Sequence, residues 1–281
     1  MHLIKDIFNK HSLEVQSYLP LSGGDINDVY QVKTKDQDFV IKLNSASRYP
    51  DMFEIEADSL KLLSETNSFT IPQVIAYGQS EDKTYLIITH ISSGQNKNFS
   101  EKFASALAKL HRRQSDYYGL DFDNYIGRLP QPNQPKTKDP VAFYVNLRLE
   151  PQFKLAHEKG FKFQNIDAFY KNLESIIPQE KASLIHGDLW SGNYLVTHKG
   201  NACIFDPAIG YACREMDIAM MKLFGGYPHS IFEIYNEIFP LEADWKFRTE
   251  LWQLYYILVH VNLFGSSYYS RARAMLAKYN A

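Results

Sequence analysis

Three oxygen-bearing side chains between residues 186 and 206 stand at a spacing that suits phosphoryl transfer. Asp188 and Asn193 are five residues apart on one predicted loop, and Asp206 follows the next short strand. Mg²⁺ prefers oxygen ligands, and one or two carboxylates with an amide and substrate phosphates suffice to hold it. A further carboxylate that faces an acceptor hydroxyl can take its proton. We therefore predict Asp188 as the catalytic base, and Asn193 and Asp206 as Mg²⁺ ligands.

Short strands are expected to position these groups. A strand-like run at 194–197 is separated by a turn from a second run at 202–205, and another apolar run, 183–185, precedes the loop. Protein kinases use the same order, with a base Asp, an Asn five residues later and a downstream Asp on the metal. Asp and Asn are also common in turns, so a hairpin flanked by two turns is the alternative interpretation. The complete run His-Gly-Asp-Leu-Trp-Ser-Gly-Asn at 186–193, followed by Asp206, favours catalysis.

Lys42 and Glu56 form a second predicted pair. In the run 39–43, period-two alternation places Lys42 on the face of Val40 and the three large apolar residues on the other face. A buried ammonium needs a partner, although a lysine can also extend to solvent. A helix predicted over about 50–65 carries Glu56 within its apolar stripe. We predict that Lys42 pairs with Glu56 and contacts the phosphates of ATP, as the corresponding pair does in kinases.

The first 90 residues predict a five-stranded antiparallel sheet with one helix packed on it. Gly23 and Gly24 lie in its first turn, where free N–H groups can face phosphate; an ordinary hairpin turn is the alternative. The backbone of Thr89, His90 and Ile91, which follow the last strand, is expected to face adenine. A short helix is expected over 3–12, and strands over 15–21, 29–33, 38–43, 74–77 and 84–89, with a turn at 78–83.

The rest of the chain predicts a mainly helical region. We expect an N-terminal ATP-binding lobe over 1–90 and a catalytic and substrate-binding lobe over 91–281. An aromatic connection without periodicity spans 116–135, and such long connections are usually functional when they are not disordered. Helices are expected over 140–158, 165–177, 214–224, 231–239, 244–264 and 267–278, after a helical stretch that begins at 99.

Composition restricts the class of protein. A hydrophobic content of 45% and a charged content of 22% are ordinary for a globular protein. A net charge of −2 gives no basic field for nucleic acid or an anionic membrane. Two cysteines, Cys203 and Cys213, make no disulfide framework. No signal peptide or membrane span is apparent, so a cytoplasmic protein, monomeric or weakly dimeric, is expected.

The chain resembles the fructosamine kinase family, also called ketosamine 3-kinases, which is related to aminoglycoside, choline and protein kinases. The resemblance covers nearly the whole length. The octapeptide at 186–193 is its most specific element. The other matching motifs lie at 23–27, 40–43, 52–56, 119–124, 130–133, 205–208 and 214–226. The resemblance implies a two-lobed, protein-kinase-like α+β fold and the phosphorylation by ATP of the 3-hydroxyl of a ketosamine, a reaction that repairs glycated amines.

The resemblance also implies supporting roles for residues near the predicted base. Asp217 would brace the backbone around His186, with helix capping as the alternative. Trp190 would pack against the face of the sugar or, equally, against the helical lobe. The loop from Tyr211 to Glu215 would lie near the acceptor.

This sequence departs from the family pattern at Ala212-Cys213, which puts the acceptor preference in doubt. The alternatives are a kinase for another small hydroxyl compound, such as an aminoglycoside or an amino alcohol, and a nucleotide-binding pseudokinase. The presence of Lys42, Glu56, Asp188, Asn193 and Asp206 together argues against the pseudokinase.

Overall fold

The computed structural model describes residues 2–21, 27–96 and 98–280. The chain forms two compact units that interleave along the sequence. The first consists of residues 1–99 and 192–207, and the second of residues 100–191 and 208–281. The division into functional lobes at residue 90 stays a prediction.

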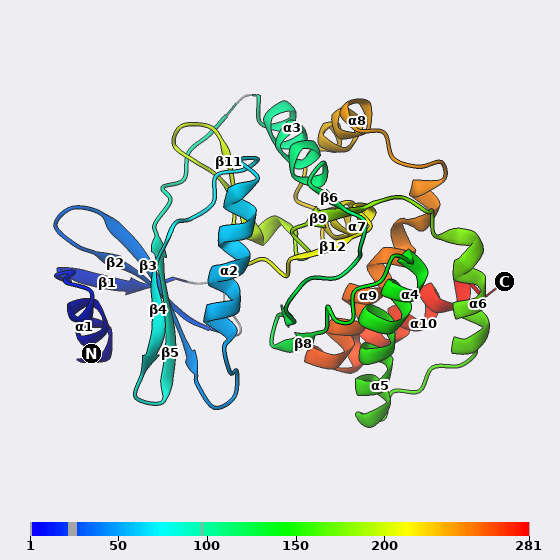
Figure 1. Ribbon diagram of the computed structural model, residues 1–281, viewed down its shortest axis with the longest axis horizontal. Helices are drawn as coiled ribbons and strands as arrows, with labels where there is room; N and C mark the ends of the chain where they lie inside the picture. The colour runs from blue at the N-terminus through cyan, green and yellow to red at the C-terminus, as the bar shows by residue number, and fades with distance from the viewer. Residues whose placement is uncertain (1, 22–26, 97, 281) are drawn as a thin grey trace. The chain divides into compact units, whose positions relative to one another are not determined.

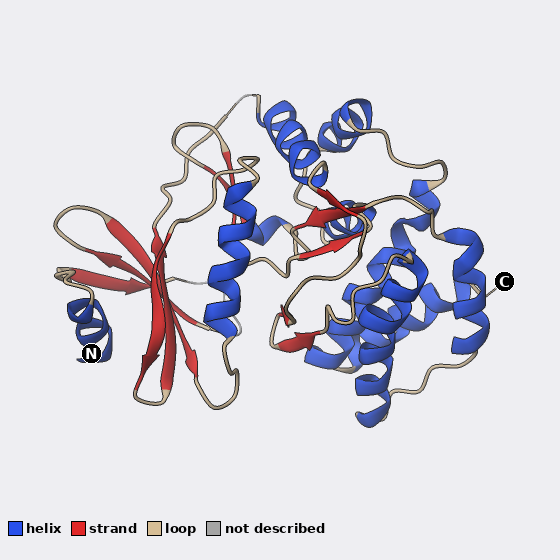
Figure 2. Cartoon of the chain, in the orientation of Figure 1, coloured by secondary structure: helices blue, strands red, loops and turns tan. Residues whose placement is uncertain are grey.

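The first unit contains the expected five-stranded antiparallel sheet (Figures 1 and 2). Its strand order is β1-β2-β3-β5-β4, and every neighbouring pair is antiparallel. The turn expected over 78–83 is wrong, because both strands extend into it and only Glu81 and Asp82 connect them. The strands are β1 (Ser17–Pro20), β2 (Asp28–Lys33), β3 (Asp38–Ser45), β4 (Val74–Ser80) and β5 (Lys83–Thr89).

Two helices pack on this sheet. The apolar face of β3 forms a core with α1 (His2–Lys10), in which Phe8 and Phe39 meet edge to face at 5.9 Å. Helix α2 (Met52–Glu65) packs against β4 and β5. Alternating apolar residues on β3 therefore bury one face under α1 and leave the face of Lys42 for other partners.

A hairpin from the middle of the chain completes the first unit. It consists of β10 (Tyr194–Val196) and β11 (Ala202–Ile204), and the 3₁₀-helix η2 (Ser191–Asn193) precedes it. The Thr70 N–H donates to the Ala202 carbonyl at 3.0 Å, and the Ile204 N–H donates to the Thr70 carbonyl at 3.2 Å. These bonds attach the segment that carries Asn193 and Asp206 to the unit that carries Lys42.

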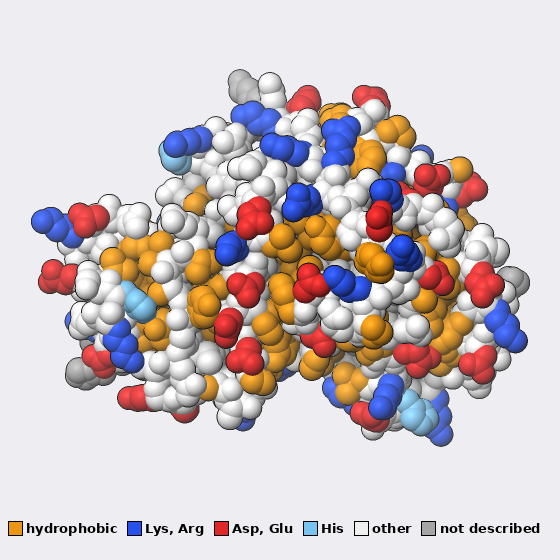
Figure 3. Space-filling view, viewed as in Figure 1, with side chains coloured by type: hydrophobic (Ala, Val, Ile, Leu, Met, Phe, Trp, Pro, Cys, Tyr) orange, Lys and Arg blue, Asp and Glu red, His pale blue; other side chains and the backbone are white. Residues whose placement is uncertain are grey.

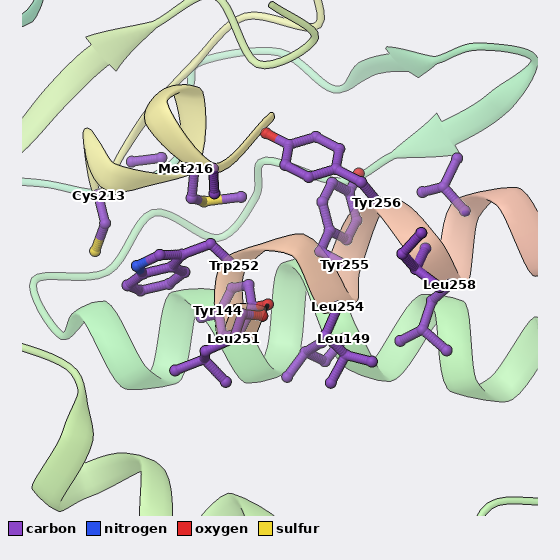
Figure 4. Packing of buried hydrophobic residues seen from close by; sticks show 14 of the residues in the cluster. Tyr144, Leu149, Cys213, Met216, Leu251, Trp252, Leu254, Tyr255, Tyr256 and Leu258 are labelled. Carbon is purple, nitrogen blue, oxygen red and sulfur yellow. Dashed lines mark hydrogen bonds between the residues drawn. The ribbon is translucent and has the colours of Figure 1, made fainter. Parts of the chain in front are cut away.

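The second unit is mainly helical. Helix α9 is buried on nearly all sides from Leu251 onward and forms the core of this unit, where Trp252 meets Tyr144 edge to face at 4.7 Å (Figure 4). Its helices are α3 (Phe99–His111), α4 (Pro140–Tyr144), the π-helix η1 (Val145–Leu149), α5 (Glu150–Glu158), α6 (Ile166–Ile176), α7 (Glu215–Leu223), α8 (His229–Ile238), α9 (Trp245–Phe264) and α10 (Ser266–Lys278).

Two small β-structures of the second unit were not expected from the sequence. A three-stranded sheet has the order β12-β9-β6, with β6 (Gln114–Ser115), β9 (Ala182–Ile185) and β12 (Gly210–Ala212). A hairpin of β7 (Asn124–Ile126) and β8 (Leu129–Gln131) lies in the connection predicted to be irregular.

The distribution of charged side chains and the character of the helices agree with the near-neutral net charge and the ordinary hydrophobic content. Acidic and basic side chains are interspersed over the face in Figure 3. Among the described residues, no helix is long and apolar enough to cross a membrane.

Candidate active site

Lys42 stands at the centre of an ion-pair cluster in the first unit. Its Nζ donates to Glu56 Oε1 at 2.5 Å and also to Asp206 Oδ1. The three residues come from β3, from α2 and from the end of the β10–β11 hairpin. The predicted pairing of Lys42 with Glu56 is therefore present, and Asp206 joins it.

Electrostatics keep this ammonium charged. Lys42 is only 4% exposed. Burial alone would lower the pKa of Lys42, but the nearby carboxylates of Asp206 and Glu56 outweigh that effect and raise it. A charged, buried amine with a half-exposed carboxylate beside it is suited to exchange that carboxylate for another anion, such as a phosphate.

Asn193 and Asp206 lie together at the base of the hairpin. Asn193 is buried, and its Nδ2 lies 3.4 Å from the Asp206 carbonyl oxygen. The Phe205 N–H donates to the Asn193 carbonyl at 3.1 Å. Asp206 adopts a left-handed backbone conformation with φ of 57°, which turns the chain directly after β11. The hairpin therefore brings an amide and a carboxylate side by side.

The residues predicted to face adenine are only partly available. The Thr89 N–H donates to the Gln73 carbonyl at 2.9 Å, and the His90 N–H donates to the Asp38 carbonyl at 3.1 Å. The sheet thus uses both of these amides. For the Ile91 N–H, no partner is found in the described part of the chain, so this group is the remaining donor for a base. Gly23 and Gly24 lie outside the described residues.

Asp188 belongs to the second unit, on the loop that follows β9. It is half-buried, and its N–H lies 3.3 Å from Nδ1 of His186. Asp188 lies near α9, where burial first and its negative charge in addition raise the pKa values of Tyr255 and Tyr256.

Asp217 braces the loop as the resemblance implied. Its Oδ2 accepts from the His186 N–H at 2.8 Å, and its Oδ1 accepts from the Gly187 N–H at 2.9 Å. The His186 and Asp217 side chains are fully buried, and Asp217 projects from α7. A buried carboxylate that accepts two amide bonds fixes the backbone immediately before Asp188.

Sequence reasoning missed the residues that hold Asp217. His111 of α3 contacts Asp217 Oδ2 through Nε2 at 3.2 Å and the Tyr235 hydroxyl through Nδ1 at 2.7 Å. Arg214 Nη1 donates to the same hydroxyl at 3.3 Å. Because an arginine only donates and a carboxylate only accepts, Tyr235 donates to Nδ1 and the His111 Nε2–H donates to Asp217. The apolar stripe of α3 concealed this histidine among core residues.

Trp190 and Glu215 have different surroundings. Trp190 is 36% exposed, and its backbone carbonyl oxygen accepts from the Tyr227 hydroxyl at 3.4 Å; both alternatives for its ring stay predictions. Glu215 is 2% exposed and accepts two bonds from Arg248, at 2.6 and 2.9 Å, and one from Trp252 Nε1 at 2.8 Å. A direct contact of Glu215 with an acceptor is therefore excluded in this arrangement.

That the loop around Ala212-Cys213 lies near the acceptor stays a prediction, but these two residues themselves are buried. Ala212 belongs to β12, and both residues are buried in the core of the second unit. The Cys213 sulfur lies 4.0 Å from the Tyr118 hydroxyl. This departure from the family pattern therefore changes core packing rather than a surface that an acceptor can touch.

The comparisons with known proteins agree along the whole chain. The sequence model of the family described as fructosamine kinase matches residues 2–281. A protein named probable ketoamine kinase, from Enterococcus faecium, is 36% identical over 267 residues, which are 93% of this chain and 94% of the relative. A crystal structure assigned as a fructosamine-3-kinase, from Haemophilus somnus, has a TM-score of 0.89 at 30% identity and covers 98% of this chain and 96% of that chain.

A more distant structure bears on the fold. Spectinomycin phosphotransferase, solved with ADP and spectinomycin, has a TM-score of 0.63 at 16% identity over 99% of this chain and 92% of that chain. The expected kinase-like α+β fold is confirmed by these structural neighbours.

Proposed function

Because the chain belongs to the fructosamine kinase family and is therefore a phosphotransferase acting on a hydroxyl group, we propose that it phosphorylates the 3-hydroxyl of a ketosamine with ATP. The observation that carries the kinase chemistry is the Lys42 ammonium held between Glu56 and Asp206. A structural ion pair needs only one carboxylate beside the cation. Lys42 has a second one, the half-exposed Asp206, which can bind a metal ion while a phosphate takes its place beside Lys42.

In the proposed reaction Asp188 accepts the proton of the sugar hydroxyl while that oxygen attacks the γ-phosphorus of ATP. One oxygen–phosphorus bond forms, the bond to the bridging oxygen breaks, and ADP leaves. Lys42 holds the α- and β-phosphates, with Glu56 fixing its position. The bond that Lys42 donates to Asp206 is released as the phosphates bind.

Mg²⁺ is part of the proposal, and the donor set fits it. The described residues contain no cluster of three or more His, Cys, Asp or Glu side chains that could enclose an ion. One carboxylate and one amide, Asp206 and Asn193, suit an ion that takes its other ligands from phosphates and water. When bound, Mg²⁺ would offset the charge that develops on the transferred group.

Exposed aromatic side chains of the second unit support a sugar acceptor. Trp190 is followed by Ser191, which lies directly against Gly226. Phe224, close by in sequence, is exposed, and its ring lies 5.1 Å from that of His260. Exposed rings offer apolar faces for the C–H face of a sugar. We propose that Trp190 contacts the acceptor.

Product identification tests the acceptor. The protein is incubated with ATP, Mg²⁺ and a fructosamine or ribulosamine, and the product is located by mass spectrometry and ³¹P NMR. Phosphate on the 3-hydroxyl is expected. Aminoglycosides and choline are assayed in parallel, and turnover of these alone would replace the ketosamine by the alternative acceptors. Nucleotide binding without turnover of any acceptor would favour the pseudokinase.

Four wider features belong to the same proposal. The nucleotide side of the site is assigned to an N-terminal lobe over 1–90 and the acceptor side to a lobe over 91–281. The acceptor can be a free sugar-amine or a glycated lysine on a protein, which glycated peptides in the same assay distinguish. Dependence on ATP makes the cytoplasm the proposed location. The proposed oligomeric state is a monomer or a weak dimer.

A further inference from the structure

Three buried carboxamides form a cluster in the second unit that the reaction does not use. They are Asn124, Gln131 and Asn133, all at most 3% exposed. They belong to the β7–β8 hairpin and to the residue pair that follows it. We call them, with Arg148 and Tyr255, the amide cluster. The hairpin carries two of the family motifs, 119–124 and 130–133, to which the sequence assigned no role.

Hydrogen bonds fix the orientation of every amide in the cluster. Arg148 Nη2 donates to Asn133 Oδ1 at 2.8 Å, so the Asn133 Nδ2 faces the other way and donates to Asn124 Oδ1 at 3.1 Å. Asn124 then has its Nδ2 left to donate. On the other side, the Tyr255 hydroxyl donates to Gln131 Oε1 at 2.6 Å, which leaves the Gln131 Nε2 to donate. Because Arg148 and Tyr255 act as donors at the two ends, no amide can flip without losing bonds.

The remaining donors of this network converge on one short backbone segment. Asn124 Nδ2 donates to the Ile209 carbonyl at 2.7 Å, and Gln131 Nε2 donates to the Ala208 carbonyl at 3.1 Å and to Asn124 Oδ1 at 2.7 Å. Side-chain amides therefore satisfy two successive buried carbonyls. These carbonyls begin the segment two residues after Asp206.

The same segment supports the loop of the predicted base. The Ala208 N–H donates to the His186 carbonyl at 2.9 Å. Gly187 lies so close that a Cβ on it would come within 2.0 Å of the Ala208 oxygen. Asp217 thus accepts from the N–H groups of His186 and Gly187, and the Ala208 N–H donates to the carbonyl of His186, so this backbone is held from both sides.

The cluster also contains a buried cation. Arg148 lies on the π-helix η1, is 2% exposed, and has no ion-pair partner in the described part of the chain. It instead donates to the Pro132 carbonyl at 2.6 Å and stacks over Phe143 at 4.5 Å. An unpaired buried charge is costly, so its retention at the end of an oriented network argues for a specific role in ordering that network.

We propose that the amide cluster positions Asp188, by holding the segment 208–210 against the backbone of His186 and Gly187. Asn124 and Gln131 are the positioning residues, and Arg148 and Tyr255 set their orientation. This inference rests on the proposed role of Asp188 as the base. Asn124 and Gln131 thereby hold the backbone of Ala208 and Ile209, which follow the predicted metal ligand Asp206.

Two variants test the proposal in the full-length protein. Gln131→Met removes the bonds to Ala208 and Asn124, and Tyr255→Phe removes only the hydroxyl that orients Gln131. Since misplacement of a catalytic group by about 1 Å can cost about a hundredfold, we expect kcat to fall about tenfold to a hundredfold in Gln131→Met and less in Tyr255→Phe. The KM for ATP should stay unchanged in both.

A matched control separates positioning from stability. Gln152 is equally buried in the same unit and accepts two bonds from Asn262 Nδ2, at 2.9 Å each, and among the described residues neither side chain is bonded to a member of the amide cluster. Gln152→Met should lower Tm but leave kcat unchanged. If Gln131→Met and Tyr255→Phe lower kcat no more than Gln152→Met does, the proposal is wrong. If Gln131→Met does not fold, the comparison of kcat between Tyr255→Phe, which keeps the aromatic ring, and Gln152→Met tests the proposal.

A second readout does not depend on turnover. Hydrogen exchange at the N–H groups of Ala208 and Gly187 should become faster in Gln131→Met and Tyr255→Phe, but not in Gln152→Met. Unchanged exchange would overturn the inference even if the wild-type protein proves to be a kinase. Faster exchange in a protein that turns over no acceptor would contradict the proposed function and leave the structural part of the inference standing.

Discussion

At the scale of single residues, the site is defined by charges that are each held by more than one neighbour. Lys42 is shared by Glu56 and Asp206, and Asp217 accepts from two amides and from His111. Shared charges of this kind are sensitive to single substitutions, since removing one partner leaves another buried and uncompensated.

Asp188→Asn tests the base. The amide keeps the size of the side chain but cannot accept a proton, so kcat should fall about 10²- to 10⁴-fold. ATP affinity, measured by calorimetry, should remain unchanged. The exposed Asp121, which pairs with Lys136, provides the control Asp121→Asn with normal kcat. A kcat within about twofold of wild type for Asp188→Asn would rule out the base role.

His111→Gln tests the buried histidine through the pH dependence of stability. Burial lowers the pKa of His111, so the side chain stays neutral in the folded protein while the unfolded chain takes up a proton below about pH 6.5. The free energy of unfolding should therefore fall as pH drops below that value, by about 1.4 kcal/mol per pH unit from this group.

In His111→Gln this contribution should vanish, because Gln retains a donor for Asp217 and does not titrate. Urea unfolding at pH 7.5, 6.5 and 5.5 measures the slope. His198→Gln, at an exposed histidine, should keep the wild-type slope. Equal slopes in all three proteins would show that His111 is not the group responsible.

At the scale of elements, the catalytic loop depends on a close approach between two backbones. Gly187 has φ of 80° and lies against the Ala208 carbonyl, whereas Gly160 has φ of 88° and an added Cβ there would meet nothing within 4 Å. These two glycines share the backbone conformation but differ in their surroundings.

Gly187→Ala should therefore destabilise the protein more than Gly160→Ala. Both substitutions carry the left-handed backbone cost of about 1–2 kcal/mol. Only the methyl group added in Gly187→Ala would also force the segment 208–210 away from the loop, so this variant should lower kcat as well. Thermal unfolding and steady-state kinetics of both variants measure the difference, and equal losses of stability with normal kcat would contradict the close-approach argument.

Sequence patterns predicted the elements with strong periodicity. The strands over 38–43 and 84–89 and the helix over about 50–65 were predicted because apolar alternation or an apolar stripe runs through each. The π-helix and the three-residue strands β7, β8 and β12 were missed. They are too short to show a period, and tertiary contacts such as the bond from Asn124 to Ile209 hold them.

The residues of the candidate site likewise fall into those that the sequence predicted and those that it did not. The complete octapeptide at 186–193, with Asp206 after the next strand, pointed to Asp188, Asn193 and Asp206, and alternation pointed to Lys42. His111 and Tyr235 could not be recognised, because a residue on an apolar stripe is normally a core residue and because His111 is more than 100 residues from both Tyr235 and Asp217. Glu215 was assigned either to support the site or to contact the substrate, and only packing revealed its bonds with Arg248 and Trp252.

At the scale of the whole molecule, the two units have separate apolar cores. One surrounds β3 and α1, and the other surrounds α9 (Figure 4). A ligand that binds only the folded protein stabilises it by mass action, by about 2.7 kcal/mol at a hundredfold excess over Kd.

ATP with Mg²⁺ should therefore raise the Tm of the first unit, and EDTA should remove most of the increase. Differential scanning calorimetry with ATP, with ATP and Mg²⁺, and with ATP and EDTA measures this effect. In Asp206→Ala the Mg²⁺-dependent part should disappear. An Asp206→Ala protein with the full Mg²⁺-dependent shift would exclude Asp206 as a metal ligand.

The interleaving of the two units along the chain has a consequence for biosynthesis. The first unit needs residues 192–207, which leave the ribosome only after residues 100–191 of the second unit. At about 5–20 residues per second, roughly 5–20 s pass between the emergence of the sheet and that of its last hairpin. During this interval the sheet has formed, but the ammonium of Lys42 does not yet have Asp206 as a partner. The half of the protein assigned to ATP therefore cannot mature before the loop of Asp188 has been synthesised.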